Sequence, residues 1–124
     1  MKEKIETNLA PGAIGPYSQA VVTNDLVFVS GQLPIDAETG QMAEDIQQQT
    51  RQSLLNIKYI LEKAGSSLEK VVKTTVLLKN MEDFAAMNEV YATFFEIDCP
   101  ARVCYEVVKL PKDALVEIDC IAVK

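Results

Sequence analysis

Apolar residues recur at helical spacing in the middle of the chain. From about Asp45 to Ala64 they fall three or four residues apart, or at sums of these steps, with polar residues between them. These apolar positions are Ile46, Leu54, Ile57, Leu61 and Ala64. Gly65 follows at the position where helices commonly end in a left-handed residue. The pattern predicts one amphipathic helix over 45–64.

A second helix is predicted after Asn80, which is a suitable N-cap and is followed by Asp83 in the first turn. One face of this helix carries Phe84, Asn88, Tyr91 and Phe95. Asn88 is the polar member of that face and must find hydrogen bonds there. Pro100 closes the segment.

The remaining segments read as strands. They are 4–8, 17–23, 26–30, 71–78, 99–107 and 115–121. The turn signal Asn24-Asp25 predicts a hairpin between the second and third of them. Residues 109–113 contain Pro111 and charged residues, so we expect a connection there that joins the last two strands as an antiparallel pair.

Side chains alternate between the two faces of a strand, so each face of this expected pair can be written down. One face reads as core, with Val103, Tyr105, Val107, Val116, Ile118 and Cys120. The other face carries Arg102, Cys104, Glu106, Glu117 and Asp119. If water covers that second face, its charges are merely solvated. If another chain covers it, it forms a buried polar pocket with one fixed cation.

The element order predicts an α+β fold, with a mixed sheet of five to six strands and two helices on one face. The length of 124 residues suits a single domain, 1–124. The other sheet face has apolar residues and no element of the chain to cover it. Uncovered apolar sheet surface is usually an interface, so we expect a homo-oligomer with that face inward.

Composition narrows the possible functions. The net charge of −6 argues against nucleic acid or an anionic membrane as the main partner. Three cysteines without metal spacing and no histidine make a metal site improbable and remove the usual general base. The start of the chain has no long apolar run, and no run of about eighteen apolar residues occurs anywhere. We therefore expect a cytoplasmic protein with reduced thiols.

Four motifs in order resemble the RidA (YjgF) family of reactive-intermediate deaminases. They are GPYSQA at 15–20, VSGQLP at 29–34, PARVCYEV at 100–107 and LPKDALVEI at 110–118. The similarity covers essentially the whole chain. Val103 and Tyr105 depart from the family pattern, which commonly has a small polar residue and a smaller aliphatic residue there.

The resemblance implies a chorismate-mutase-like fold and a homotrimer with three sites at subunit interfaces. It also implies hydrolysis of 2-aminoacrylate, 2-iminobutanoate and related enamine or imine acids to 2-keto acids and ammonia, without metal or organic cofactor. By the same resemblance Arg102 grips the substrate carboxylate, Cys104 lines the site and Glu117 activates water. The residues that match pocket positions of the family are Tyr17, Ser30, Gly31 and Asn88.

Each of these residues also has a structural interpretation. Arg102 could be an ion-pair partner of Glu106 or Asp119, although a guanidinium suits a carboxylate ligand. Glu117 could be an ordinary strand carboxylate, and Cys104 a small buried hydrophobe. Two other functions also compete with deamination. One is a regulatory module that binds 2-keto acids or other small carboxylates, and the other is a ribonuclease or translation inhibitor, which the acidic charge and missing histidine disfavour.

Overall fold

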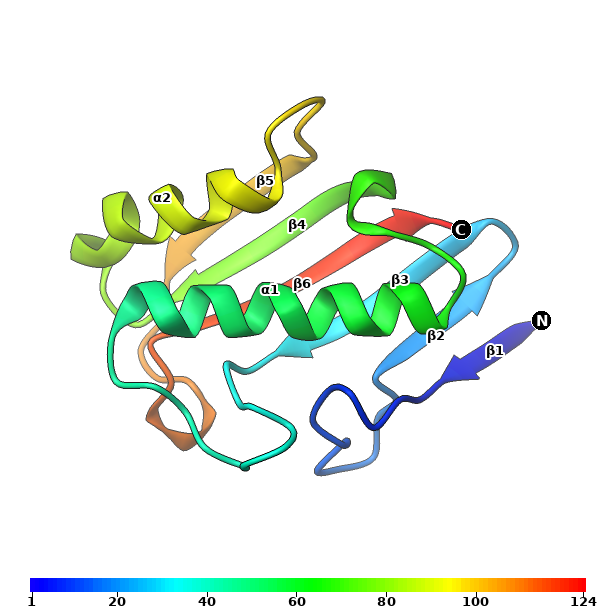
Figure 1. The fold of residues 1–124 in the computed structure, drawn as a ribbon, viewed down its shortest axis with the longest axis horizontal. Helices are drawn as coiled ribbons and strands as arrows, with labels where there is room; N and C mark the ends of the chain where they lie inside the picture. Colours follow the sequence, from blue (N-terminus) through cyan, green and yellow to red (C-terminus); the bar gives the residue numbers. More distant parts are fainter.

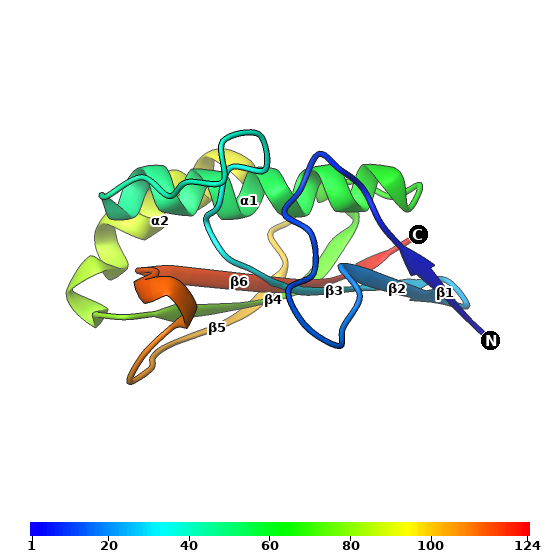
Figure 2. The same cartoon turned by 90° about the horizontal axis from the view of Figure 1, so that it is seen from below.

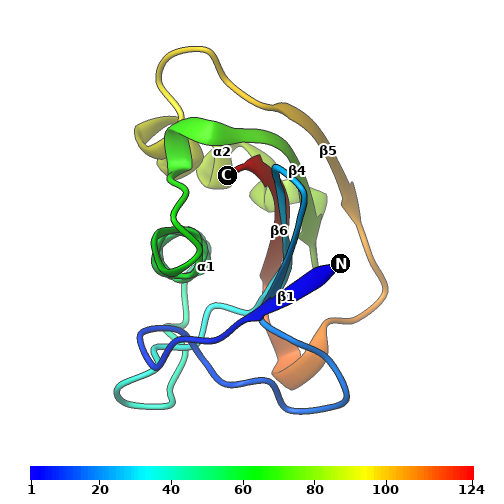
Figure 3. The same ribbon diagram turned by 90° about the vertical axis from the view of Figure 1, so that its right-hand side faces the viewer.

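A computed structural model describes residues 1–124. Its strands are β1 (Lys2–Ile5), β2 (Ala20–Thr23), β3 (Leu26–Gln32), β4 (Val71–Leu78), β5 (Ala101–Glu106) and β6 (Val116–Val123). Its helices are α1 (Ile46–Lys63) and α2 (Phe84–Phe94). Both helices cover the same face of the sheet, and the opposite face is bare (Figures 1, 2 and 3). This is the α+β layout that the sequence predicts.

The six strands lie in the order β1-β2-β3-β6-β4-β5. All neighbouring pairs are antiparallel except β4 and β5, which are parallel. The predicted pairing of the last two strands is therefore wrong, because β4 lies between β5 and β6. The physical reason is the helix α2 between β4 and β5. A helical crossover of this length returns the chain in the same direction, which favours a parallel neighbour.

The two predicted helices form. The predicted end signal of α1 is observed, whereas the predicted cap of the second helix is not. The Asp45 side chain caps α1 by accepting a hydrogen bond from the Gln48 amide at 2.8 Å, and Gly65 takes the left-handed φ of 85° after the helix. Asn80 makes no capping bond with its side chain. Instead the Glu106 carboxylate at the end of β5 accepts from the Met81 amide at 2.8 Å. A long-range cap thus replaces the expected local one.

The core lies between the helices and the sheet. Its most deeply buried large side chains are Leu54, Ile57, Ile60, Leu61, Leu78, Met87 and Ile118. On β6 the alternation is as predicted, since Val116, Ile118 and Cys120 are buried and Glu117 and Asp119 are only partly so. The two carboxylates of β6 therefore lie on the helix-free face.

Helix α1 also buries polar side chains, which hold loops rather than a ligand. Ser53 donates from Oγ to the Gln32 carbonyl at 2.9 Å. Asn56 donates from Nδ2 to the carbonyls of Leu33 and Ile35 at 3.1 and 3.0 Å. These bonds satisfy backbone groups where β3 leaves the sheet. The end of β3, which contains Gly31, is thereby tied to the helix layer.

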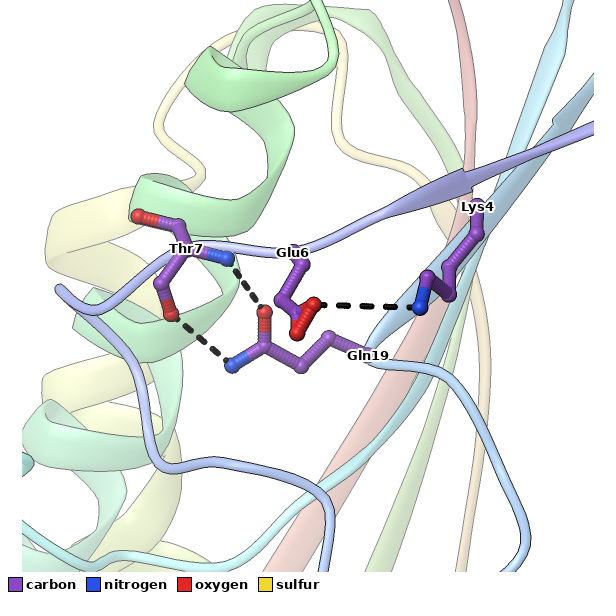
Figure 4. A network of polar contacts seen from close by, with 4 residues as sticks. All are labelled: Lys4, Glu6, Thr7 and Gln19. Carbon is purple, nitrogen blue, oxygen red and sulfur yellow. Dashed lines mark hydrogen bonds and ion pairs between the residues drawn. The ribbon is translucent and has the colours of Figure 1, made fainter.

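A buried glutamine fixes the loop that precedes β2 (Figure 4). Gln19 accepts from the Thr7 amide at 2.7 Å and donates from Nε2 to the carbonyls of Thr7, Ala10 and Pro11 at 3.1, 3.3 and 2.7 Å. The loop of 10–16 is therefore an ordered path, as its glycines and prolines predict. Part of it extends past the sheet toward the helix-free side (Figure 2).

No helix of the structure has the length and apolar character needed to cross a membrane.

Candidate functional site

The predicted site residues fall into two groups, which we call the arginine cluster and the glutamate cluster. The arginine cluster comprises Arg102 and Cys104 of β5 with Phe84, Asn88 and Tyr91 of α2. The glutamate cluster comprises Glu117 of β6 with Ser30 and Gly31 of β3 and Tyr17 of the preceding loop.

In the arginine cluster, Arg102 points from β5 toward α2. Its Nη1 donates to Asn88 Oδ1 at 2.7 Å. Its guanidinium carbon lies 4.7 Å from the centre of the Tyr91 ring and 5.5 Å from that of Phe84. The helical spacing of these three residues, one turn apart, places them on the face that meets Arg102.

This orientation corrects the predicted faces of β5. Arg102 and Cys104 are partly buried on the helix side, and Cys104 packs against the core. Val103 and Tyr105, which we expected in the core, are 42% and 50% exposed. The apolar side chains of β5 indicated the wrong face as the one that meets the core. β5 is an edge strand, and its helix-side face meets the aromatic residues of α2. The long stem of an arginine packs well on such rings.

Arg102 has no carboxylate partner in the chain. The ion pairs within 4.0 Å are Lys4 with Glu6 and Lys109 with Asp113, and all four side chains are largely exposed. Glu106 instead accepts from the Met81 amide in the turn before α2, and Asp119 lies on the other face of the sheet. The ion-pair interpretation of Arg102 is therefore wrong. A guanidinium has five N–H donors, so most of those of Arg102 are left for a ligand.

Burial raises the pKa of the Cys104 thiol, and the nearby Arg102 charge lowers it by less. The thiol is therefore protonated at neutral pH, which fits a lining residue rather than a nucleophile. The structure contains no group of three or more His, Cys, Asp or Glu that could hold a metal ion.

In the glutamate cluster, Glu117 lies against the backbone of Gly31. A Cβ atom added to Gly31 would stand 3.0 Å from Glu117 Cδ and 3.1 Å from Oε1. The register of β3 and β6 shifts between Val29 and Gln32, so Gly31 belongs to an irregularity that lets the carboxylate approach.

Burial raises the pKa of Glu117 above its usual 4.5, and the charge of Asp119, two residues along the same face, raises it further. A carboxylate with a raised pKa is a better proton acceptor near neutral pH. The electrostatics of the cluster therefore suit a general base.

Ser30 and Tyr17 are the other members of this cluster. Ser30 Oγ donates to the Ser18 carbonyl at 2.6 Å, and the Tyr17 hydroxyl accepts from the Ile14 amide at 3.3 Å.

Tyr17 and Gly31 line a hollow of about 260 Å³. Lys112, which sequence reasoning missed, also lines it and has a left-handed φ of 58°. Its signals in the sequence were its place in a Pro-containing connection and in the LPKDALVEI motif of 110–118.

The two clusters lie on opposite faces of the sheet. Arg102 faces the helices from β5, whereas Glu117 faces away from them on β6, with β4 between the two strands. One chain therefore does not bring the predicted site residues together.

Comparison with known proteins defines the family. The family model described as Endoribonuclease L-PSP matches residues 7–124, so the chain belongs to this family, which is the RidA (YjgF) family. The resemblance inferred from the four motifs is confirmed.

Individual relatives are similar over almost their full length. A RutC family protein of Pyrococcus horikoshii is 58% identical, covering 100% of this chain and 99% of the relative. The 2-iminobutanoate/2-iminopropanoate deaminase of Salmonella typhimurium is 49% identical, covering 100% and 99%. The crystal structure of E. coli TdcF with bound serine is 46% identical and matches with a TM-score of 0.96, covering 98% of each chain.

Proposed function

We propose that this protein hydrolyses 2-imino acids and their enamine tautomers, such as 2-aminoacrylate and 2-iminobutanoate, to 2-keto acids and ammonia. Water adds to the imine carbon, a proton passes to the nitrogen, and the C–N bond breaks as the carbonyl forms. Water supplies the keto oxygen and two hydrogens of the ammonia. The reaction needs a held substrate, a placed water and a route for protons, and no change of oxidation state.

The observation that carries this proposal is that Arg102 is partly buried without a carboxylate partner. Its guanidinium is partly buried and has an amide oxygen and two rings as neighbours, but no carboxylate. A substrate carboxylate would supply the missing anion through a bidentate pair. In this role Asn88 orients the guanidinium, and Cys104 lines the bound substrate.

Glu117 is the proposed base that orients or deprotonates the attacking water. Its raised pKa suits this role, and Gly31 leaves room for its carboxylate. Ser30 and Tyr17 complete the wall on this side of the site.

Because the two clusters lie on opposite faces of one sheet, we propose that each active site forms between two subunits of a homotrimer. One subunit provides the arginine cluster and its neighbour provides the glutamate cluster. The bare sheet face supports this assembly, since it exposes Phe28, Val103 and Tyr105 at 41%, 42% and 50%. A ring of three equivalent head-to-tail interfaces gives three identical sites.

A regulatory module that binds small carboxylates is the second candidate. The crystal structure of E. coli TdcF with bound serine supports binding of a small amino acid by this chain. The family description names an endoribonuclease, but the net charge of −6 and the absence of histidine disfavour RNA as substrate.

The test is keto-acid formation from an imine made in situ by an amino-acid oxidase, with semicarbazide present to trap imine that escapes hydrolysis. Semicarbazide forms the same semicarbazone from the imine and, more slowly, from the keto acid, so the proposal expects the protein to lower the initial rate of semicarbazone formation in proportion to its concentration. An unchanged initial rate together with tight binding of a keto acid would favour the regulatory module. RNA cleavage that survives further purification would favour the ribonuclease.

A further inference from the structure

The guanidinium of Arg102 is held on two sides by α2. The Tyr91 ring lies 4.7 Å and the Phe84 ring 5.5 Å from its central carbon, and Asn88 binds one of its nitrogens. Of the two rings, that of Tyr91 is the nearer and the more buried. The orientation of Arg102 therefore depends first on how firmly Tyr91 is itself fixed.

Tyr91 is fixed by a fully buried threonine. The Tyr91 hydroxyl and Thr74 Oγ1 are 2.8 Å apart, and Thr74 has no exposed surface. Thr74 is also the residue of β4 that pairs with Arg102 in the parallel ladder. Strand pairing, one hydrogen bond and one cation–π contact thus close a triangle of Thr74, Tyr91 and Arg102.

Two further features describe the surroundings of Tyr91. The Phe95 ring packs on Tyr91, with 4.8 Å between ring centres and 43° between planes. Burial raises the pKa of Tyr91, which moves its ionisation still further above neutral pH. Tyr91 therefore presents a neutral, closely packed ring to the guanidinium.

We propose that Tyr91, locked by Thr74, is a positioning residue that fixes the Arg102 guanidinium in the orientation that receives a substrate carboxylate. The carboxylate ligand rests on the proposed function. Tyr91 contacts Arg102 and acts through it. The hydroxyl of Tyr91 ties the ring to β4 through its hydrogen bond with Thr74. The ring in turn makes the cation–π contact with the Arg102 guanidinium.

The test uses the assembled protein and two readouts. The first is the mobility of the Arg102 Nε–H group, measured by NMR relaxation without ligand. The second is the Kd for 2-oxobutanoate, with 2-oxobutanamide as the uncharged comparison. The variants are Tyr91→Leu, Tyr91→Phe and Thr74→Val. Tyr59→Leu is the control, because Tyr59 is a half-buried tyrosine of α1 without a contact to the Arg102 cation.

Tyr91→Leu is expected to make the Arg102 Nε–H more mobile and to weaken 2-oxobutanoate binding about two- to thirtyfold, the range for one cation–π contact. Binding of the amide should change little. Thr74→Val and Tyr91→Phe keep the packing volume and should shift both readouts in the same direction by less. Tyr59→Leu should leave both at the wild-type values.

A rigid Arg102 and a wild-type Kd in folded Tyr91→Leu would overturn the inference, as would equal losses for the keto acid and the amide. If Tyr91→Leu does not fold, unchanged readouts in both Thr74→Val and Tyr91→Phe would overturn it. Both readouts are independent of turnover. A wild-type protein that binds 2-oxobutanoate but hydrolyses no imine would refute the deaminase proposal alone, whereas one that binds no keto acid would refute both.

Discussion

Arg102 and Glu117 lie on opposite faces of the same sheet. Arg102 points from the edge strand β5 into the aromatic face of α2, and Glu117 points from β6 toward the bare side. A substrate carboxylate bound at Arg102 is thus separated from Glu117 of the same chain by the sheet itself. This separation is the physical reason for proposing that a second subunit completes the site, and it determines which variants are informative.

Replacing Arg102 tests whether its guanidinium binds the substrate carboxylate. Arg102→Ala should lower kcat/KM at least about ten- to a hundredfold, the range for losing a charged hydrogen-bonded contact. Arg102→Lys should recover little, because an ammonium lacks the planar fork. Circular dichroism and mass measurement check that fold and assembly persist.

Cys104→Ser supplies the comparison for Arg102→Ala, since it alters the same strand and leaves the cation in place. It should do much less damage than Arg102→Ala. Near-normal turnover in folded Arg102→Ala would show that Arg102 does not bind the substrate carboxylate. Complete loss of turnover in folded Cys104→Ser would argue for thiol chemistry.

Replacing Glu117 tests the proposed base. Glu117→Gln should lower kcat about a hundred- to ten-thousandfold while leaving keto-acid binding intact. In the wild type, turnover should rise with pH as Glu117 loses its proton, with a midpoint above 4.5 because burial and Asp119 raise this pKa. Glu117→Gln should not show this rise of turnover with pH.

The measurements are kcat across pH and keto-acid Kd on one preparation of Glu117→Gln. Equal losses in binding and turnover would make Glu117 a positioning residue. No loss in either would make it an ordinary strand carboxylate.

Gly31→Ala should displace the Glu117 carboxylate, because the new Cβ would stand 3.0 Å from Cδ. The expected result is a loss of about tenfold to a hundredfold in kcat, since small misplacements of a reacting group are costly. Gly12→Ala is the matched control, as nothing lies within 4 Å of the added Cβ at that position. Equal activity of the two alanine variants would show that the close approach at Gly31 has no catalytic consequence.

The bare sheet face predicts an oligomer. Sedimentation should show a trimer for the wild type, and Val103→Asp should shift it toward smaller species because a charge would be buried at the interface. Ile97→Asp, at an 83% exposed position in the loop after α2, should leave the trimer intact. A stable wild-type monomer at micromolar concentration would contradict the proposed assembly.

The sequence predicted the elements better than their pairing. Helical spacing located both helices, and the β-branched run 71–78 became β4 with the same bounds. The pairing of β5 and β6 was wrong because nearness along the chain says nothing about β4 entering between them. Hydrogen bonding between strands separated in sequence is decided by the whole fold.

The site was predicted as a set of residues but not as an arrangement. Alternation divides a strand into two faces but does not say which face meets the core. For β5 the apolar side chains Val103 and Tyr105 suggested the wrong one, because that face is left for another surface. The approach of Glu117 to Gly31 depends on a register shift between β3 and β6, which no local pattern encodes.

Subunit mixing tests the shared site most directly. Arg102→Ala and Glu117→Gln subunits are each expected to have low activity alone, but a neighbouring pair can combine the intact Arg102 of one with the intact Glu117 of the other. In a cyclic trimer, each mixed assembly then has one complete site, so random equal mixing should restore about a quarter of wild-type activity. Activity no higher than the mean of the two parent variants, in trimers shown to contain both subunits, would contradict a site shared between subunits.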